Sequence, residues 1–79
     1  MKNSVLAGFH AVGARLRTAP ETISVVYADP SRRDKRMRDM REKLLAAGVR
    51  VMNADAKRLD GMASGVPHQG IVALVFRRS

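Results

Sequence analysis

Basic side chains are concentrated in one short segment of this sequence, residues 32–41. Six of its ten residues are Arg or Lys, and two are Asp. Arginine presents a planar guanidinium that donates paired hydrogen bonds to phosphate and stacks on flat rings. The segment therefore indicates binding of a polyanion. The candidate contacts are Arg32, Arg33, Lys35, Arg36 and Arg38.

The alternative for this segment is a solvated helix face whose charges pair with each other four residues apart. The pairs with that spacing are Asp34–Arg38, Lys35–Asp39 and Asp39–Lys43. Basic residues still exceed acidic ones by four in residues 32–41, six against two. The excess lies near the expected start of a helix, where the helix dipole disfavours cations. This position favours an external anion over internal pairing.

Two further motifs place polar groups beside glycine. Gly-Phe-His-Ala-Val occupies residues 8–12, and His68, Gln69 and Gly70 precede an apolar run. Glutamine both donates and accepts hydrogen bonds, and glycine lets a ligand approach the backbone. Residues 68–70 are thus a candidate binding loop, with His10 as a second contact. The alternative is structural: His68 and Gln69 bond the loop backbone in a turn leading into the strand, and His10 serves the helix start.

Catalytic constellations are weak in this sequence. Two histidines and no cysteine make no convincing metal site, and no serine lies in a nucleophile elbow. Asp55 and Asp60 fit a helix cap and an exposed surface position. No glycine-rich loop is available to hold a phosphate. We therefore expect this chain to be non-catalytic by itself, with neither a cofactor site nor a metal site of its own.

Composition bounds the class of protein and its partner. With 79 residues the chain forms one domain at most, and its formal net charge is +8. Eleven of the 15 basic residues are arginines, which points to nucleic acid as the polyanion. No apolar run is long enough for a signal peptide or a membrane span. These features predict a cytoplasmic protein that does not bind membranes.

The apolar spacing predicts four strands alternating with three helices. The strands are expected at residues 5–7, 22–28, 49–52 and 71–76, and the helices at 9–19, 31–47 and 56–63. Ser31 and Asp55 are the expected caps of the second and third helices. The last strand is almost wholly apolar, as expected at the centre of a sheet. This order indicates an α/β fold with a mixed, mostly parallel sheet.

Four short motifs, taken in order, resemble the N-terminal substrate-binding domain of SpoU/TrmH-type RNA 2′-O-ribose methyltransferases. They are residues 8–12, residues 34–36, Leu59 with Asp60, and residues 68–72. Each piece is short, but their order and spacing make the combination specific, and the resemblance covers residues 6–76. Within the family, it points to the bacterial enzymes that methylate a guanosine in the peptidyl-transferase region of 23S rRNA.

The resemblance implies a three-layer α/β/α sandwich, similar to the small ribosomal proteins that bind kinked RNA. It implies structured RNA, 23S rRNA, as the partner. The positions that match the motifs, and so are implied RNA contacts, are His10, Lys35, Arg36, His68, Gln69 and Gly70. This copy departs from the pattern in its additional arginines Arg32, Arg33 and Arg38, and in Pro67 before the loop.

The resemblance also implies a separate SPOUT domain that binds S-adenosylmethionine, transfers the methyl group and forms a homodimer. No motif of that domain occurs in residues 1–79. The expectation is therefore a single RNA substrate-binding domain without its catalytic domain, belonging to an S-adenosylmethionine-dependent parent enzyme. Two alternatives stay open: a protein–protein interaction module whose basic helix meets an acidic partner, and a free-standing ribosome-associated RNA-binding protein.

Overall fold

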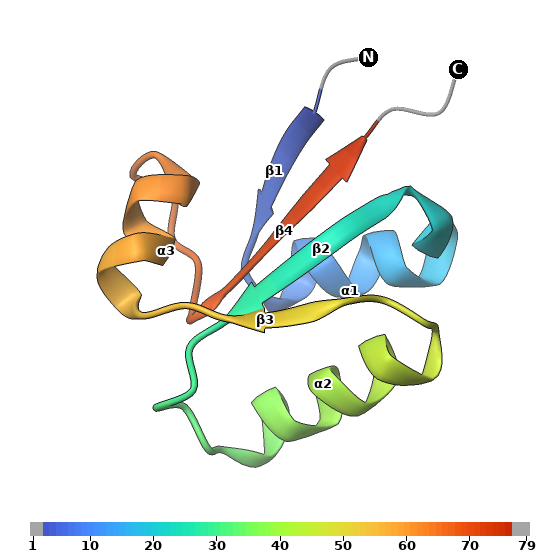
Figure 1. Ribbon diagram of the computed structural model, residues 1–79, viewed down its shortest axis with the longest axis horizontal. Coiled ribbons are helices and arrows are strands. Elements are labelled where there is room, and N and C mark those ends of the chain that lie inside the picture. Colours follow the sequence, from blue (N-terminus) through green and yellow to red (C-terminus); the bar gives the residue numbers. More distant parts are fainter. Residues whose placement is uncertain (1–2, 77–79) are drawn as a thin grey trace.

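Strands and helices alternate along the chain in the computed structural model, which describes residues 3–76 (Figure 1). The strands are β1 (Asn3–Ala7), β2 (Ile23–Ala28), β3 (Val51–Asn53) and β4 (Ile71–Phe76). The helices are α1 (Phe9–Thr18), α2 (Lys35–Ala46) and α3 (Ala56–Ala63), with a short 3-10 turn, η1, at Pro20–Thr22. The predicted order of elements is confirmed.

The sheet is mixed, and the expectation that it is mostly parallel was wrong. Its strand order is β1-β4-β2-β3, with β4 antiparallel to both of its neighbours and only β2 and β3 paired in parallel. The helix α3 is followed by a loop, residues 64–70, that returns the chain to the sheet edge where β2 ends. Ile71 accordingly pairs with Ala28. A parallel β4 would have needed α3 and its loop to carry the chain back to the opposite edge, as in a βαβ unit.

The start of α2 also differs from the prediction. The backbone N–H and the hydroxyl of Ser31 both donate to Oδ1 of Asp29, at 2.9 and 2.8 Å, so Ser31 closes a turn rather than capping the helix. The helix begins at Lys35, and Arg32 lies in the loop before it. The predicted cap of α3 is confirmed, because Oδ1 of Asp55 accepts from the N–H of Arg58 at 2.9 Å.

Two apolar clusters hold the helices to the sheet. The larger contains Phe9 and Val12 of α1 and Met37 and Leu44 of α2, and the smaller contains Leu59 and Ala63 of α3. The strand β4 contributes Ile71, Ala73 and Val75 to the first and Val72 to the second. As predicted, β4 is an interior strand. Within residues 3–76, no helix has the length and apolar character needed to span a membrane.

The carboxyl ends of β1, β2 and β3 meet the start of β4 at one edge of the sheet (Figure 1). Backbone hydrogen bonds join the segments there: Gly8 N–H to the Ile71 carbonyl at 3.1 Å, Asp29 N–H to the Gly70 carbonyl at 2.9 Å, and Ala54 N–H to the Ala28 carbonyl at 3.0 Å. The motifs at residues 8–12, 32–36 and 68–70 therefore lie together, although up to 60 residues separate them.

Candidate nucleic-acid interface

Phe9 is at the centre of the cluster that forms at this edge. Its ring is 3% exposed and belongs to the larger core cluster. The guanidinium carbons of Arg32 and Arg36 lie 5.2 and 4.7 Å from the ring centroid. Contact between a guanidinium and an aromatic face is attractive and orients the flat cation. Phe9 thus supports two arginines from beneath, and its burial prevents it from stacking on a base directly.

Arg32 ties three segments together. Its Nε and Nη2 donate to Oδ1 and Oδ2 of Asp34 at 3.1 and 3.2 Å, and its Nη1 donates to the Gln69 carbonyl. The hydrogen bonds from Arg32 hold the pKa of the Asp34 carboxyl below its usual value. With its cation paired and its plane on Phe9, Arg32 fixes the loop geometry more than it offers a free charge.

Gln69 caps α1 from a distance in the sequence. Its Oε1 accepts from the N–H of Phe9 at 3.1 Å, at the first residue of the helix. The preceding residue, Gly8, has no side chain to serve as a cap. Its φ of +93° also favours glycine. Gln69 thus has a structural role, but at the start of α1 and not in the backbone of its own loop. RNA contact through its exposed side chain stays a prediction.

His68 uses both ring nitrogens within the fold. Its Nδ1 accepts from the N–H of Gly70 at 2.9 Å, so Nε2 carries the proton toward Oδ1 of Asp60, 2.5 Å away. The His68 side chain is 14% exposed and that of Asp60 72%. Asp60 is a surface residue, as predicted, and it also orients the histidine. Any RNA contact by His68 must use the remaining exposed part of its ring.

Gly70 supplies space for Arg32. It is buried, has a φ of +85°, and a Cβ built on it would lie 2.6 Å from Cδ of Arg32. No side chain fits between the two segments. The absence of a side chain at Gly70 consequently lets the Arg32 side chain pass close to the backbone. A direct RNA contact by Gly70 stays a prediction.

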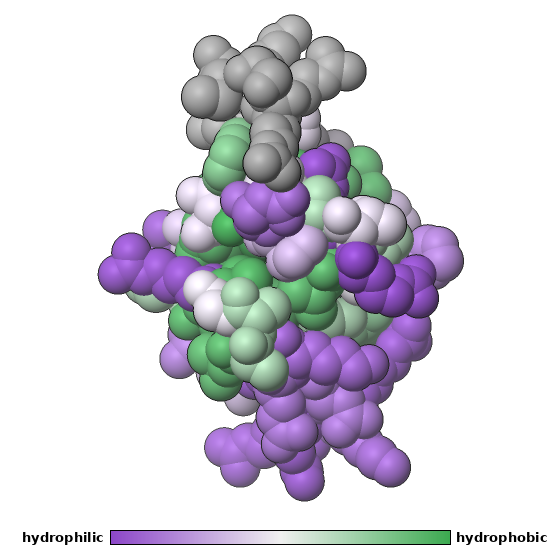
Figure 2. All heavy atoms as spheres, turned by 90° about the vertical axis from the view of Figure 1, so that its right-hand side faces the viewer, coloured by the Kyte–Doolittle hydropathy of each residue, from purple (hydrophilic) through white to green (hydrophobic). Residues whose placement is uncertain are grey.

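Exposed cations surround this cluster. Arg33, Lys35, Arg36 and Arg38 are all exposed, and Figure 2 shows hydrophilic side chains gathered over the part of the molecule where α2 lies. In the part of the chain that the structure describes, none of the pairs Asp34–Arg38, Lys35–Asp39 and Asp39–Lys43 forms an ion pair. Asp34 pairs with Arg32 instead, and the exposed cations of α2 stay available to an external anion.

Four arginines line an open pocket of about 380 Å³ between α2 and the strand ends. We call it the arginine pocket, and its lining residues are Pro30, Arg32, Arg33, Met37, Arg38, Arg41 and Asn53. Nη2 of Arg41 donates to Oδ1 of Asn53 at 3.1 Å, which holds that guanidinium at the pocket wall. Arg33 and Arg38, both predicted as contacts, meet here. Lys35 lies on the first turn of α2 and lines neither this pocket nor the groove described next.

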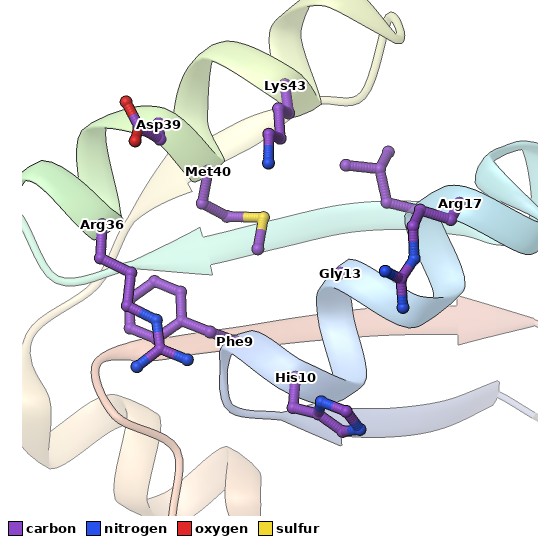
Figure 3. Close-up of a pocket in the computed structure, with 9 residues that line it drawn as sticks. Phe9, His10, Gly13, Arg17, Arg36, Asp39, Met40 and Lys43 are labelled. Atoms are coloured by element: carbon purple, nitrogen blue, oxygen red, sulfur yellow. The ribbon is translucent and has the colours of Figure 1, made fainter.

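His10 lies on a second hollow, between α1 and α2, with a volume of about 310 Å³ (Figure 3). We call it the helix groove. Its lining residues are Phe9, His10, Gly13, Leu16, Arg17, Arg36, Asp39, Met40 and Lys43. Arg36, on Phe9, connects this groove to the central cluster. His10 is exposed here, and the remaining predicted contacts lie at the strand ends or on α2.

The prediction from sequence did not include Phe9, Arg17, Arg41 or Lys43 as site residues. Arg41 falls in the basic segment and lies one helical turn after Arg38, so helical periodicity was the available signal. Arg17 and Lys43 lack such a signal, because only the packing of α1 against α2 brings them to one groove. Among residues 3–76, no three His, Asp or Glu side chains gather in a way that could hold a metal ion.

Comparison with known proteins gives a consistent result. The family model for RNA 2′-O ribose methyltransferase substrate binding matches residues 5–79. Over 75 residues, 95% of this chain, the sequence is 57% identical to the 23S rRNA (guanosine-2′-O-)-methyltransferase RlmB of Bordetella pertussis, of which it covers 31%. The proteins of the same name from Ralstonia nicotianae and Neisseria meningitidis serogroup B are 49% and 41% identical over 91% and 86% of this chain, which covers 29% and 27% of them.

The chain thus spans about a third of the length of the curated relatives it matches. The match covers both glycine-flanked motifs, the basic segment and the arginines of both hollows. A substrate-binding role agrees with a surface of exposed cations set around an ordered cluster at the strand ends. On the extent of the family match, the chain belongs to the RNA 2′-O ribose methyltransferase substrate-binding family, the SpoU substrate-binding domains.

Proposed function

We infer that this chain is a single substrate-binding domain that captures structured 23S rRNA, so that a separate domain can methylate a guanosine 2′-hydroxyl. The arrangement at the sheet edge carries this proposal: exposed arginines surround a cluster whose members hold each other in place through Arg32, Gln69 and Phe9. A preorganised surface of this kind binds RNA phosphates without paying again for side-chain order. Positioning the ribose raises the rate of a reaction by fixing geometry, and needs no reactive group here.

The candidate RNA contacts fall into two groups: exposed cations, and residues that also make hydrogen bonds within the fold. Arg33, Lys35, Arg36 and Arg38 are exposed and serve as phosphate contacts, with His10 beside them on the helix groove. His68, Gln69 and Gly70 form the ordered loop, whose exposed atoms supply directional contacts to the RNA. Arg32 positions that loop.

The parent enzyme draws its methyl group from S-adenosylmethionine. The arginine pocket is lined mainly by arginines, and the helix groove carries Arg17, Arg36 and Lys43 beside its apolar residues. These cations suit a polyanion and repel the sulfonium cation of that cofactor. We therefore assign the cofactor to the catalytic domain. We also propose that this domain makes the dimer contact and that the enzyme works in the cytoplasm with its rRNA. A three-layer α/β/α sandwich like that of the ribosomal proteins that bind kinked RNA fits the two clusters served by alternate residues of β4.

The test is the salt dependence of RNA binding by the full chain. Fluorescence anisotropy with a hairpin from the peptidyl-transferase region of 23S rRNA gives the affinity at several salt concentrations. The logarithm of the affinity should fall with log salt by about 0.7 to 0.9 for each phosphate contact. Arg38→Gln should lower that slope by about one contact. Arg50→Gln, at an exposed arginine that lines neither hollow, is the control.

A flat salt dependence, or equal losses from Arg38→Gln and Arg50→Gln, would contradict the proposal. The first result would mean that phosphate contacts do not drive binding. The second would mean that total charge, and not the surface around α2, attracts the RNA.

A further inference from the structure

We propose that the helix groove seats a single-stranded nucleotide segment that flanks the structured RNA. This inference rests on the proposed function and extends it, because it adds an unpaired stretch to the substrate. The ligand class is a nucleobase with the phosphates on either side of it. The groove begins at Phe9 and Arg36, which it shares with the cluster at the strand ends, and extends from there between α1 and α2 (Figure 3).

The groove combines an apolar floor with a cationic rim. Phe9, Gly13, Leu16 and Met40 supply the apolar atoms. Figure 3 shows Met40 and Lys43 reaching from α2 toward α1, with Arg36 over Phe9 at one end and Arg17 toward the other. A base has flat apolar faces and a charged backbone beside it, so it needs both kinds of surface close together. A duplex buries those faces in its own stack and cannot use such a floor.

Gly13 keeps the groove open. It lies inside α1, where glycine is less favourable than alanine by about 1 kcal/mol. A Cβ built there would meet only Cε of Met40, at 3.5 Å, an ordinary contact with the end of a flexible side chain. The helix packing therefore does not require glycine at this position. A larger side chain at this position would occupy the groove.

Arg36 provides the means of holding a base. Its guanidinium lies over the Phe9 ring with Cζ 4.7 Å from the centroid, and the residue is exposed. A guanidinium plane accepts a base on its free face, as an aromatic ring does. Phe9 itself is buried, so a base in the groove would stack on the guanidinium of Arg36 and not on the ring. Phosphates on either side of the base can then meet Arg17 and Lys43.

Charge selects this occupant over the alternatives. Arg17, Arg36 and Lys43 face a single carboxylate, Asp39, around the groove. A second copy of the chain would bring another net charge of +8 to the same place. An acidic peptide satisfies the rim, but its carboxylate side chains offer no aromatic face on which the guanidinium of Arg36 can stack. The RNA backbone and base satisfy both the rim and the floor.

The experiment compares two RNAs and matched pairs of variants. One RNA is the 23S rRNA hairpin with blunt ends, and the other carries a four-nucleotide single-stranded tail. The tail should raise the affinity of the full chain roughly tenfold, on the order of one stacked base. Arg17→Gln and Gly13→Leu should each remove most of that gain, measured as the ratio of tailed to blunt affinity for the same variant. The matched controls, Arg50→Gln and Gly61→Leu, should keep it, because both positions are exposed and outside the groove.

The possible results are distinguishable. If the blunt hairpin binds but the tail adds nothing, or if variants and controls lose equally, the groove is not a nucleotide site and the inference is wrong while the proposed function stands. If neither RNA binds, the proposed function itself is wrong. If a poly-glutamate peptide of the same charge is weakened by Gly13→Leu as strongly as the tailed RNA, the groove serves acidic proteins and the inference is again wrong.

Discussion

Arg32 joins Asp34, Gln69 and Phe9, and its clearest measurable effect is on the Asp34 carboxyl. Its hydrogen bonds lower the pKa of Asp34, so replacing it by glutamine should return that pKa toward 3.8. Arg33→Gln is the control, since Arg33 makes no bond to Asp34 in the described part of the chain. A carboxyl carbon NMR titration reads the pKa directly. An unchanged Asp34 pKa in Arg32→Gln would mean that the bidentate pair is not formed in solution.

The same pair gives a pH dependence whose sign is fixed. A carboxyl with a lower pKa in the folded state contributes stability above its unfolded pKa of about 3.9, and loses it as the pH falls through the folded value. Hydrogen bonds from Ser31 lower the pKa of Asp29 in the same way. Stability should therefore fall below about pH 4 and less so in Asp34→Asn. Denaturation followed by circular dichroism tests this, and equal acid sensitivity of both proteins would contradict it.

Gly70 is the residue whose replacement should cost most among the glycines of the site. Gly70→Ala adds a Cβ 2.6 Å from Arg32 Cδ to a left-handed residue, which alone costs about 1–2 kcal/mol. Gly65→Ala, also left-handed but with open space, should show only the backbone cost. Gly61→Ala, inside α3, should stabilise by about 1 kcal/mol. Urea unfolding of the three variants measures this order, and equal effects at Gly70 and Gly65 would exclude the steric contact with Arg32.

The residue types of the site were accessible from the sequence, and their partners were not. Charge density and the position of glycine picked out Arg32, Arg33 and residues 68–70. Arg32 binds the Gln69 carbonyl across 37 residues of sequence. No local sequence pattern predicts a contact of that separation. The same holds for the two bonds of the His68 ring.

At the scale of elements, α1 depends on a cap from the far end of the chain. Gln69→Ala removes the acceptor for the Phe9 N–H and should lower stability by about 1 kcal/mol, the usual cost of losing a helix cap. Gln69→Glu keeps an acceptor and adds a favourable charge at the helix N-terminus, so it should not destabilise. Its RNA affinity should fall nonetheless. Urea unfolding and anisotropy on both variants separate the two roles, and a loss of stability in Gln69→Glu would refute the capping role.

Element order and most helix and strand positions followed from apolar periodicity and strand composition. The prediction of α3 at 56–63 and of β4 at 71–76 matches the structure, since caps and β-branched runs mark their ends locally. The direction of β4 was mispredicted because it is set by the loop after α3. That loop is also what brings residues 68–70 to the site, so the error in topology and the missed contacts have one cause.

For the whole molecule, the net charge of +8 acts on folding and on binding in opposite directions. Self-repulsion of the cations destabilises the compact state and is weakened by salt, whereas attraction to RNA is weakened by the same salt. Raising the salt concentration from low to moderate should therefore raise Tm by a few degrees, with roughly 1 kcal/mol corresponding to 4–8 °C in a domain of this size. RNA affinity should fall over the same range. Thermal scans and fluorescence anisotropy at matched salt concentrations measure the two effects. If Tm and RNA affinity changed in the same direction with salt, net charge would not be the cause of both.

RNA should bind this chain at the sheet edge where the three motifs converge. An amide chemical-shift titration of the full chain with the 23S rRNA hairpin, at two salt concentrations, tests it most directly. Shifts should cluster at residues 8–12, 32–38 and 68–70 and should weaken as the salt concentration rises. Shifts confined to other surfaces, or none at the lower salt concentration, would mean that these motifs serve the fold or a protein contact and that the RNA is recognised elsewhere.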